Sequence, residues 1–128
     1  MAFAFGQSNI APFAEEWDAK KHFPIDVLRE AAARGFAGIC VRDDVGGTGL
    51  SRSDAATIFE ALAYADISLT AYLTIHNMNG TILDRFGNEE QRQRWLPAMT
   101  SMELLSSYCL TEPGSGSDAA SLRTTAKK

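Results

Sequence analysis

The stretch LTAYLTIHNMNGTILDRFGNEEQ, residues 69–91, decides the fold class of this chain. Its apolar segment 69–86 is too long for a typical strand, so it predicts a helix. Gly87 ends that helix, and Asn88 is a favourable N-cap for another one. Gln91 stands three positions after Asn88, where its side chain completes a capping box. The stretch therefore predicts two successive helices with almost no loop between them.

Helix signals are also frequent on the N-terminal side of this stretch. HFPIDVLREAAARGF, residues 22–36, has Pro24 where the first turn of a helix tolerates proline and Gly35 where a helix ends. Ser51 and Asp54 form a weaker version of the capping box at the start of a further helix. We therefore predict that most of the chain before residue 102 is helical.

The composition of the chain changes after residue 102. LLSSYCLT, residues 104–111, is short, apolar and aromatic and ends in a turn, which is typical of a strand. LRTTAKK, residues 122–128, looks like the start of another strand. We therefore expect a mainly α fold, with a helical domain over residues 1–102 and the first strands of a β domain over residues 103–128.

Composition and charge argue against several classes of function. The formal net charge of −4 provides no basic surface for nucleic acid. No apolar run approaches the roughly 20 residues of a membrane-spanning helix. The first residues contain no basic leader, so we expect no targeting segment. Cys40 and Cys109 have neither metal-ligand nor redox spacing, so we expect two buried thiols and no metal site.

The strongest candidate for a binding site is the turn TEPGSGSD, residues 111–118. It offers consecutive backbone N–H groups, small residues and hydroxyls, which suit a phosphate or the polar edge of a ring. It lacks the lysine of a phosphate-binding loop and the third glycine of a dinucleotide fingerprint. Asp118 is placed to cap the short segment after the turn. Composition and spacing alone favour an ordinary turn over a phosphate site.

The remaining candidates are better explained by structure than by chemistry. The glycine-rich DDVGGTGL, residues 43–50, lacks a lysine, so we predict a structural loop. His22 and His76 have no second ligand at metal spacing and are predicted to be ordinary core or surface histidines. The sequence shows no nucleophile–base pair. Four large side chains at helical intervals are predicted to lie in the core: Tyr64, Tyr72, Met78 and Phe86.

YCLTEPGSGSDAASL, residues 108–122, resembles the flavin-binding signature of the acyl-CoA dehydrogenases. Further family-like stretches stand in the expected order: APFAEEWD, FPIDVLREAAARGFAGI, DDVGGTGLSRSDAATIFEALA, TAYLTIHNM and FGNEEQRQRWLPAM. The resemblance covers essentially the whole chain. Within the family, GGTGLSR, FEALA, IHNM and SYCLTEPGSGSDAASL are most similar to the members that oxidise isobutyryl-CoA in valine breakdown.

The resemblance implies a fold and a reaction. The family fold has an N-terminal helical domain, a middle β domain and a C-terminal helical domain, and its members usually form homotetramers. They use FAD to oxidise an acyl-CoA to the 2,3-enoyl-CoA, and the electrons pass to electron-transfer flavoprotein. The implied substrate is a short branched acyl-CoA, and the implied location is the bacterial cytoplasm or the mitochondrial matrix.

The resemblance also implies roles for residues of the turn and the segment before it. Tyr108, Leu110 and Thr111 are expected to lie against the flavin ring, with the Thr111 hydroxyl near its pyrimidine edge. Gly116 and Ser117 are expected to approach the cofactor and the acyl-CoA, and Ser117 is the expected substrate contact.

The resemblance assigns no catalytic residue to this chain. The family's catalytic glutamate lies in the C-terminal helical domain, which we expect to be absent, and the family's first helix is shortened here. The chain alone is therefore expected to be inactive. Two alternatives remain: an inactive helical module that acts only through protein contacts, and a relative of the acyl-CoA oxidases or flavin monooxygenases, which share this architecture.

Overall fold

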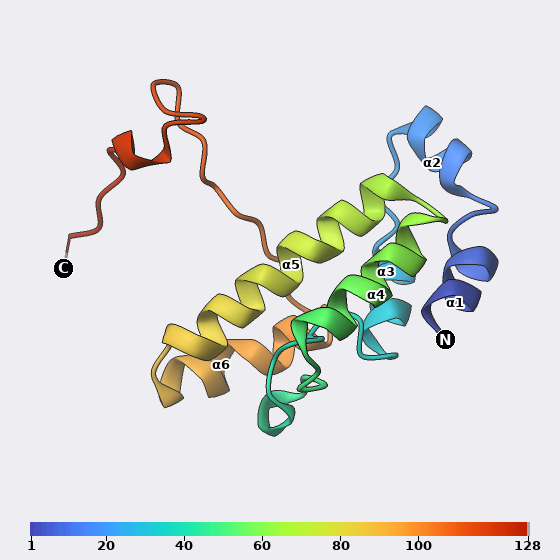
Figure 1. The fold of residues 1–128 in the computed structure, drawn as a ribbon, viewed down its shortest axis with the longest axis horizontal. Coiled ribbons are helices and arrows are strands. Elements are labelled where there is room, and N and C mark those ends of the chain that lie inside the picture. Colours follow the sequence, from blue (N-terminus) through green and yellow to red (C-terminus); the bar gives the residue numbers. More distant parts are fainter. Residues whose placement is uncertain (128) are drawn as a thin grey trace.

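The computed structural model describes residues 1–127. The helices are α1 (Ala2–Asn9), α2 (Ala14–Lys20), α3 (Ile25–Ala32), α4 (Arg52–Ala63), α5 (Ile67–Phe86) and α6 (Glu89–Thr100), with short 3₁₀ turns η1 (Asp43–Val45) and η2 (Ala119–Ser121). Figure 1 shows α4 and α6 packed along α5, and these elements with their connections form the helical body, residues 1–102. The chain after α6 leaves this body and extends away from it. The prediction of a mainly α fold is confirmed.

The junction between α5 and α6 forms as the sequence predicts. The carboxylate of Asp66 caps α5 by accepting from the N–H of Leu69, and Gly87 ends the helix. Asn88 and Gln91 then exchange two hydrogen bonds of 2.8 and 2.9 Å between side chain and backbone. This capping box starts α6 directly after α5, so the two helices pack as neighbours.

The other predicted helix ends also form. Gly35, just after α3, has φ +84°, a left-handed conformation that glycine adopts without steric cost. The N–H groups of Gly35 and Phe36 donate to the last carbonyls of that helix. Ser51 and Asp54 form the predicted capping box at the start of α4. These local signals place the helices, and burial of their apolar faces then determines how they pack.

The core lies where α1, α3, α4 and α5 meet. The residues of this core are almost completely excluded from solvent: Ala2, Phe5, Ile10, Leu28, Ala31, Ala32, Phe36, Ala37, Leu62, Leu69, Leu73 and Met102. Tyr64 and Phe86 are not among them, with 73% and 80% of their surfaces exposed, so their predicted core placement is wrong. Both stand at helix ends, Tyr64 as the C-cap of α4 and Phe86 as the last residue of α5.

The glycine-rich segment 43–50 is a structural loop, as predicted. Its second half runs back along residues 38–41, and the N–H groups of Thr48, Gly49 and Leu50 donate to carbonyls there at 2.8 to 2.9 Å. The side chain of Asn77 on α5 fastens the same region, because it accepts from the N–H of Ile39 at 2.8 Å. The loop is therefore held by backbone hydrogen bonds to residues 38–41, and the Asn77 side chain holds that segment to α5.

The two strands predicted near the C-terminus do not form among the described residues. Residues 104–111 are extended but lie beside no segment with which they pair, and a strand needs a hydrogen-bonded neighbour. One isolated bridge joins Glu112 to Ser115. Residues 122–127 are likewise unpaired by backbone hydrogen bonds, and Lys128, the last residue of the second predicted strand, lies outside the described part.

Candidate functional site

The residues predicted to bind flavin and substrate all lie on one loop outside the helical body, residues 107–118 (Figure 1). Leu110 is half-buried, and Tyr108 leaves 49% of its surface exposed. The other predicted residues are exposed: Thr111, Gly116 and Ser117. The structure therefore brings these residues into one continuous segment but does not enclose them.

A tight turn divides this loop into two arms. The N–H of Glu112 donates to the carbonyl of Ser115 at 2.9 Å, and the N–H of Ser115 donates back at 3.1 Å. Tyr108, Leu110 and Thr111 lie on the arm before this turn, and Gly116 and Ser117 lie just after it. The turn thus fixes the two arms close to each other without using any of the predicted binding groups.

Glu112 closes a larger ring around the same loop, a role that sequence reasoning missed. Its carboxylate accepts from the N–H groups of Arg123 and Thr124 at 2.9 and 2.8 Å, and from the Thr124 hydroxyl. The hydrogen bond from the Thr124 side chain, together with these two N–H groups, lowers the pKa of Glu112. The carboxylate is therefore held ionised and has a structural role in the loop. No sequence motif predicts this role.

The predicted cap on the segment after the turn is only partly present. The 3₁₀ turn η2 begins directly after Asp118, and the N–H of Ser121 donates to the Asp118 carbonyl at 3.1 Å. The Asp118 carboxylate, however, accepts from the Ser121 hydroxyl rather than from a backbone N–H. The buried Ser115 donates its hydroxyl to the same carbonyl, which ties the turn to η2.

The loop has free polar groups that fit the edge of a flavin ring. Among the described residues, no group accepts from the backbone N–H groups of Thr111, Gly116 or Ser117, and the hydroxyls of Thr111 and Ser117 are also unengaged. A Cβ built at Gly116 would meet nothing within 4 Å, so the backbone there is open to a ligand. Free donors of this kind on adjacent residues are able to bind an anion or the polar edge of a ring.

The base of the loop is fastened to α5 by a buried histidine. The His76 ring is 0% exposed, and its Nε2 lies 2.9 Å from the Met99 carbonyl of α6. Its Nδ1 lies 3.0 Å from the Ser106 hydroxyl and 3.3 Å from the Ser106 N–H. Burial lowers the pKa of His76, and the Met99 carbonyl opposes this only in part. His76 is therefore a neutral, satisfied core histidine, as predicted.

Beside this histidine, the phenol of Tyr72 is left without a partner. Its hydroxyl is buried and has no hydrogen-bond partner within the described part of the chain. Burial raises the pKa of that phenol, and the nearby Ser106 backbone opposes this only in part. The Tyr72 ring packs edge-on against Phe23, with centroids 4.9 Å apart, and lies 6.1 Å from the His76 ring. The Tyr72 hydroxyl is thus a buried polar group at the base of the loop that makes no hydrogen bond to the described residues.

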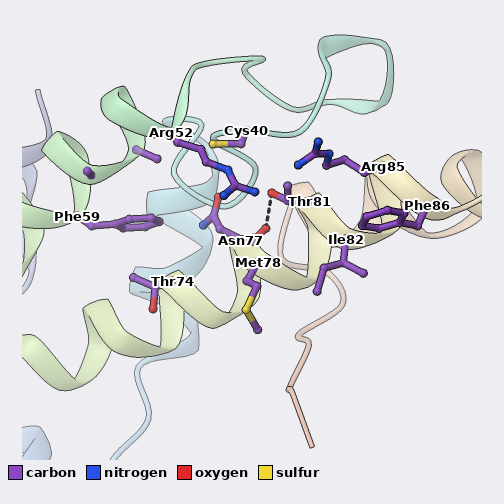
Figure 2. Close-up of a pocket in the computed structure, with 12 residues that line it drawn as sticks. Cys40, Arg52, Phe59, Thr74, Asn77, Met78, Thr81, Ile82, Arg85 and Phe86 are labelled. Carbon is purple, nitrogen blue, oxygen red and sulfur yellow. Dashed lines mark hydrogen bonds between the residues drawn. The ribbon is translucent and has the colours of Figure 1, made fainter. Parts of the chain in front are cut away.

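An apolar groove of about 370 Å³ lies on another face of α5 (Figure 2). Its wall combines apolar side chains of α4 and α5 with two arginines: Phe59, Met78, Ile82, Phe86, Arg52 and Arg85. Figure 2 shows both arginines on the side of the groove nearest Cys40. None of the residues predicted to bind flavin lines this groove.

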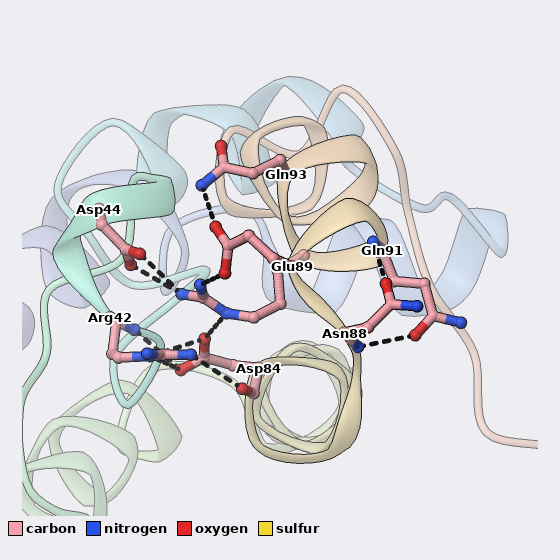
Figure 3. Close-up of polar contacts among 8 residues, drawn as sticks. Arg42, Asp44, Asp84, Asn88, Glu89, Gln91 and Gln93 are labelled. Carbon is pink, nitrogen blue, oxygen red and sulfur yellow. Dashed lines mark hydrogen bonds and ion pairs between the residues drawn. The ribbon is translucent and has the colours of Figure 1, made fainter.

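An ion-pair network centred on the buried Arg92 and Asp84 joins α5, α6 and η1 (Figure 3). Arg92, 3% exposed, donates from Nε to Asp84 at 2.8 Å, from Nη2 to Asp44 at 2.8 Å and from Nη1 to Glu89 at 2.6 Å. Arg42 also donates to Asp84, at 3.1 Å. Sequence reasoning missed this network, because Arg42 and Asp44 lie 42 and 48 positions before their partners Asp84 and Arg92.

Each carboxylate of this network pairs with an arginine, so the network is structural rather than catalytic. Burial alone would raise the pKa of Asp84, but hydrogen bonds from Arg92 and Arg42 outweigh it and hold the pKa below its usual range. Hydrogen bonds to Asp84 and Asp44 raise the pKa of the Arg92 guanidinium. The buried pair Asp84 and Arg92 therefore stays ionised near neutral pH, and Asp84 is not available to take a proton from a substrate.

Residues 1–127 contain no group of three or more metal-ligating side chains and no helix that meets the length and hydropathy needed to cross a membrane. The two cysteines are less buried than predicted. Cys40 is half-buried, beside the groove of Figure 2, and Cys109 is exposed on the loop. Cys109 is exposed because the loop extends away from the helical body, where no side chains cover it.

Comparisons with known proteins agree with the resemblance. A family model described as "Acyl-CoA dehydrogenase, N-terminal domain" matches residues 1–103. Mitochondrial isobutyryl-CoA dehydrogenase of Dictyostelium discoideum is 60% identical over 100% of this chain and 31% of its own length. The Bos taurus protein of the same name is 58% identical over 98% of this chain and 30% of its own length.

Solved structures show the same fold. The structure of PigA with FAD and proline has a TM-score of 0.92 and 30% identity, over 99% of this chain and 34% of that chain. The chain spans about a third of the length of the relatives it matches. Because the family match covers most of the chain and the helical arrangement agrees with it, the chain belongs to the acyl-CoA dehydrogenase family.

Proposed function

We propose that the protein carrying this chain oxidises a short branched acyl-CoA, isobutyryl-CoA or a close analogue, to the 2,3-enoyl-CoA. The observation that carries this proposal is the 58–60% identity to two isobutyryl-CoA dehydrogenases over nearly the whole chain. The likeness to PigA, at 30% identity, supports a shared flavoprotein fold rather than a shared substrate.

FAD is the cofactor that members of this family use, and when bound it takes up the hydride from the β-carbon of the substrate. We assign the apolar surfaces of Tyr108 and Leu110 to the face of its ring and the Thr111 hydroxyl to its pyrimidine edge. The open backbone at Gly116 supports close approach of the cofactor there. The unengaged hydroxyl of Ser117 is assigned to the acyl-CoA, which it would orient by a hydrogen bond.

We further propose that residues 1–102 are the helical domain of the family fold and that residues 103–128 begin its middle β domain. The α-proton of the substrate is then removed by a residue of the C-terminal helical domain of that fold, and no carboxylate of this chain is assigned that role. Exposed apolar side chains on α5, including Ile75, Ile82 and Phe86, support packing of this helix against further protein.

The same proposal includes the partners of the reaction. Electrons would pass to electron-transfer flavoprotein, and the protein would assemble as a homotetramer, as is usual in the family. Both curated relatives are named as mitochondrial, which supports a matrix location in a eukaryote and the cytoplasm in a bacterium.

Substrate preference tests this function. With an artificial electron acceptor, the protein carrying this chain is expected to show a kcat/KM for isobutyryl-CoA at least roughly tenfold above that for octanoyl-CoA, since a pocket shaped for a short branch excludes longer chains. Proline serves as a negative control. A preference for octanoyl-CoA would contradict the proposed substrate, and stoichiometric hydrogen peroxide without an added acceptor would show an oxidase instead.

A further inference from the structure

The 107–118 loop is joined to the helical body through one short segment. Met102, just after α6, is fully buried in the core and has φ +56°, and the N–H of Leu104 donates to the Ala98 carbonyl at 2.9 Å. Ser106 then bonds to His76 and Asn79 of α5. Every hydrogen bond made by the described residues after Ser106 stays within residues 112–124. Ser106 is therefore the last anchored point before the loop.

His76 uses both of its ring nitrogens at this point. The Met99 carbonyl only accepts, so the ring proton lies on Nε2 and is donated to it at 2.9 Å. Nδ1 is then bare, and it accepts from the N–H and the hydroxyl of Ser106. One neutral ring thus joins the end of α6 to the base of the loop, and Asn79 supports it by donating to the Ser106 hydroxyl at 3.2 Å.

We propose that His76 is a positioning residue for the flavin-binding loop, because its unprotonated Nδ1 holds Ser106 and so sets the direction in which the loop leaves the helical body. This inference rests on the proposed function. Tyr108 is only two residues beyond Ser106, and two residues span at most about 7 Å. A displacement of Ser106 therefore moves Tyr108, the predicted contact with the flavin ring, by a similar amount. A ligand site loses binding when its groups move by about 1 Å.

Two substitutions separate positioning from simple core packing. In His76→Asn, the amide oxygen takes the place of Nδ1 and can still accept from Ser106, whereas the contact with Met99 is lost. In His76→Gln, the amide nitrogen takes the place of Nε2 and can still donate to Met99, whereas Ser106 is released. Both replacements are neutral and polar, so they differ mainly in which of the two anchors they keep.

The test compares these variants in the protein that carries this chain, with and without FAD. His76→Gln is expected to accelerate hydrogen exchange of the Ser106 amide by roughly tenfold and to weaken FAD binding by a similar factor, because the acceptor of that N–H is lost. His76→Asn is expected to stay within about threefold of the wild type in both measurements. Exchange in α4 and in the first half of α5 reports whether each variant remains folded.

Equal effects of the two variants on the Ser106 amide, or no effect of His76→Gln there, would overturn the positioning role. If His76→Gln does not fold, Ser106→Ala replaces it, because it removes the hydroxyl bonds to His76 and Asn79 and is expected to accelerate exchange about threefold. Unchanged exchange in Ser106→Ala would then contradict the proposal. Failure of the wild type to bind FAD would refute the proposed function. Hydrogen exchange needs no cofactor, so it would still test whether His76 positions the loop.

Discussion

Arg92→Met is expected to lower the melting temperature of the protein by roughly 10 °C or more. The substitution keeps most of the side-chain volume but removes the only cation that reaches Asp84, Asp44 and Glu89 together in the described structure. Asp84 would remain buried with Arg42 as its one cationic partner. Thermal unfolding followed by circular dichroism measures the change.

Arg94→Met is the matched control for this substitution. Arg94 lies on the same helix but is exposed, forms no ion pair within residues 1–127, and has its guanidinium 4.7 Å from the centroid of the Trp95 ring. Its loss is expected to lower the melting temperature by no more than about 2 °C. Similar melting temperatures for the two variants would contradict the structural role of the network.

The same network predicts that the stability of the folded protein depends on pH in the acidic range. The pKa of Asp84 is lower in the folded protein than in the unfolded chain, so the unfolded chain binds a proton first as the pH falls. The stability due to Asp84 is therefore complete above the ordinary aspartate pKa and is lost as the pH drops through its folded value. In Arg92→Met the folded pKa of Asp84 should rise toward or above its ordinary value, so this acid-dependent loss of stability should become smaller, because the principal partner of the carboxylate is gone.

Gly47→Ala is expected to destabilise the protein by about 3 kcal/mol or more, the second large effect. A Cβ at this position would lie 2.0 Å from the Val41 carbonyl oxygen and 2.4 Å from its carbon. These are backbone atoms, so no side-chain rotation relieves the clash, and the loop 43–50 must separate from residues 38–41. Chemical denaturation of the wild type and the variant gives the difference in free energy.

Two other glycines provide controls. Gly49 has φ +62°, and a Cβ there would meet nothing within 4 Å, so Gly49→Ala is expected to cost only about 1 kcal/mol for its left-handed backbone. Gly114 has open space and no positive φ, so Gly114→Ala is expected to leave stability unchanged. A Gly47→Ala cost no larger than that of Gly49→Ala would show that the loop adapts, contrary to this expectation.

The helix ends were predictable because their causes are local. A cap of this kind is a hydrogen bond between residues three positions apart. The residue types at Ser51, Asn88 and Gln91 are therefore enough to predict it from the sequence. Gly35 likewise marks a backbone conformation that its own neighbours require. Signals of this kind placed four helix boundaries and the mainly α fold class.

The features that were missed depend on distant segments. Arg92 meets Asp44 only after the chain has folded back over 48 positions, and no spacing rule connects them. The extended residues 104–111 have strand-like composition but no neighbouring strand, because pairing depends on a partner that composition does not supply. For the loop, the family signature predicted which residues would cluster, whereas its anchor at His76 and Ser106 became visible only in three dimensions.

The flavin absorbance spectrum is the decisive test of the proposed dehydrogenase activity. It is recorded under anaerobic conditions on the protein that carries this chain, before and after addition of isobutyryl-CoA. We predict a bound-flavin spectrum whose visible absorbance falls when the substrate is added, because the substrate's electrons pass to FAD. A protein that binds no FAD after reconstitution, or whose bound flavin keeps its full absorbance with excess isobutyryl-CoA, would contradict the proposed function.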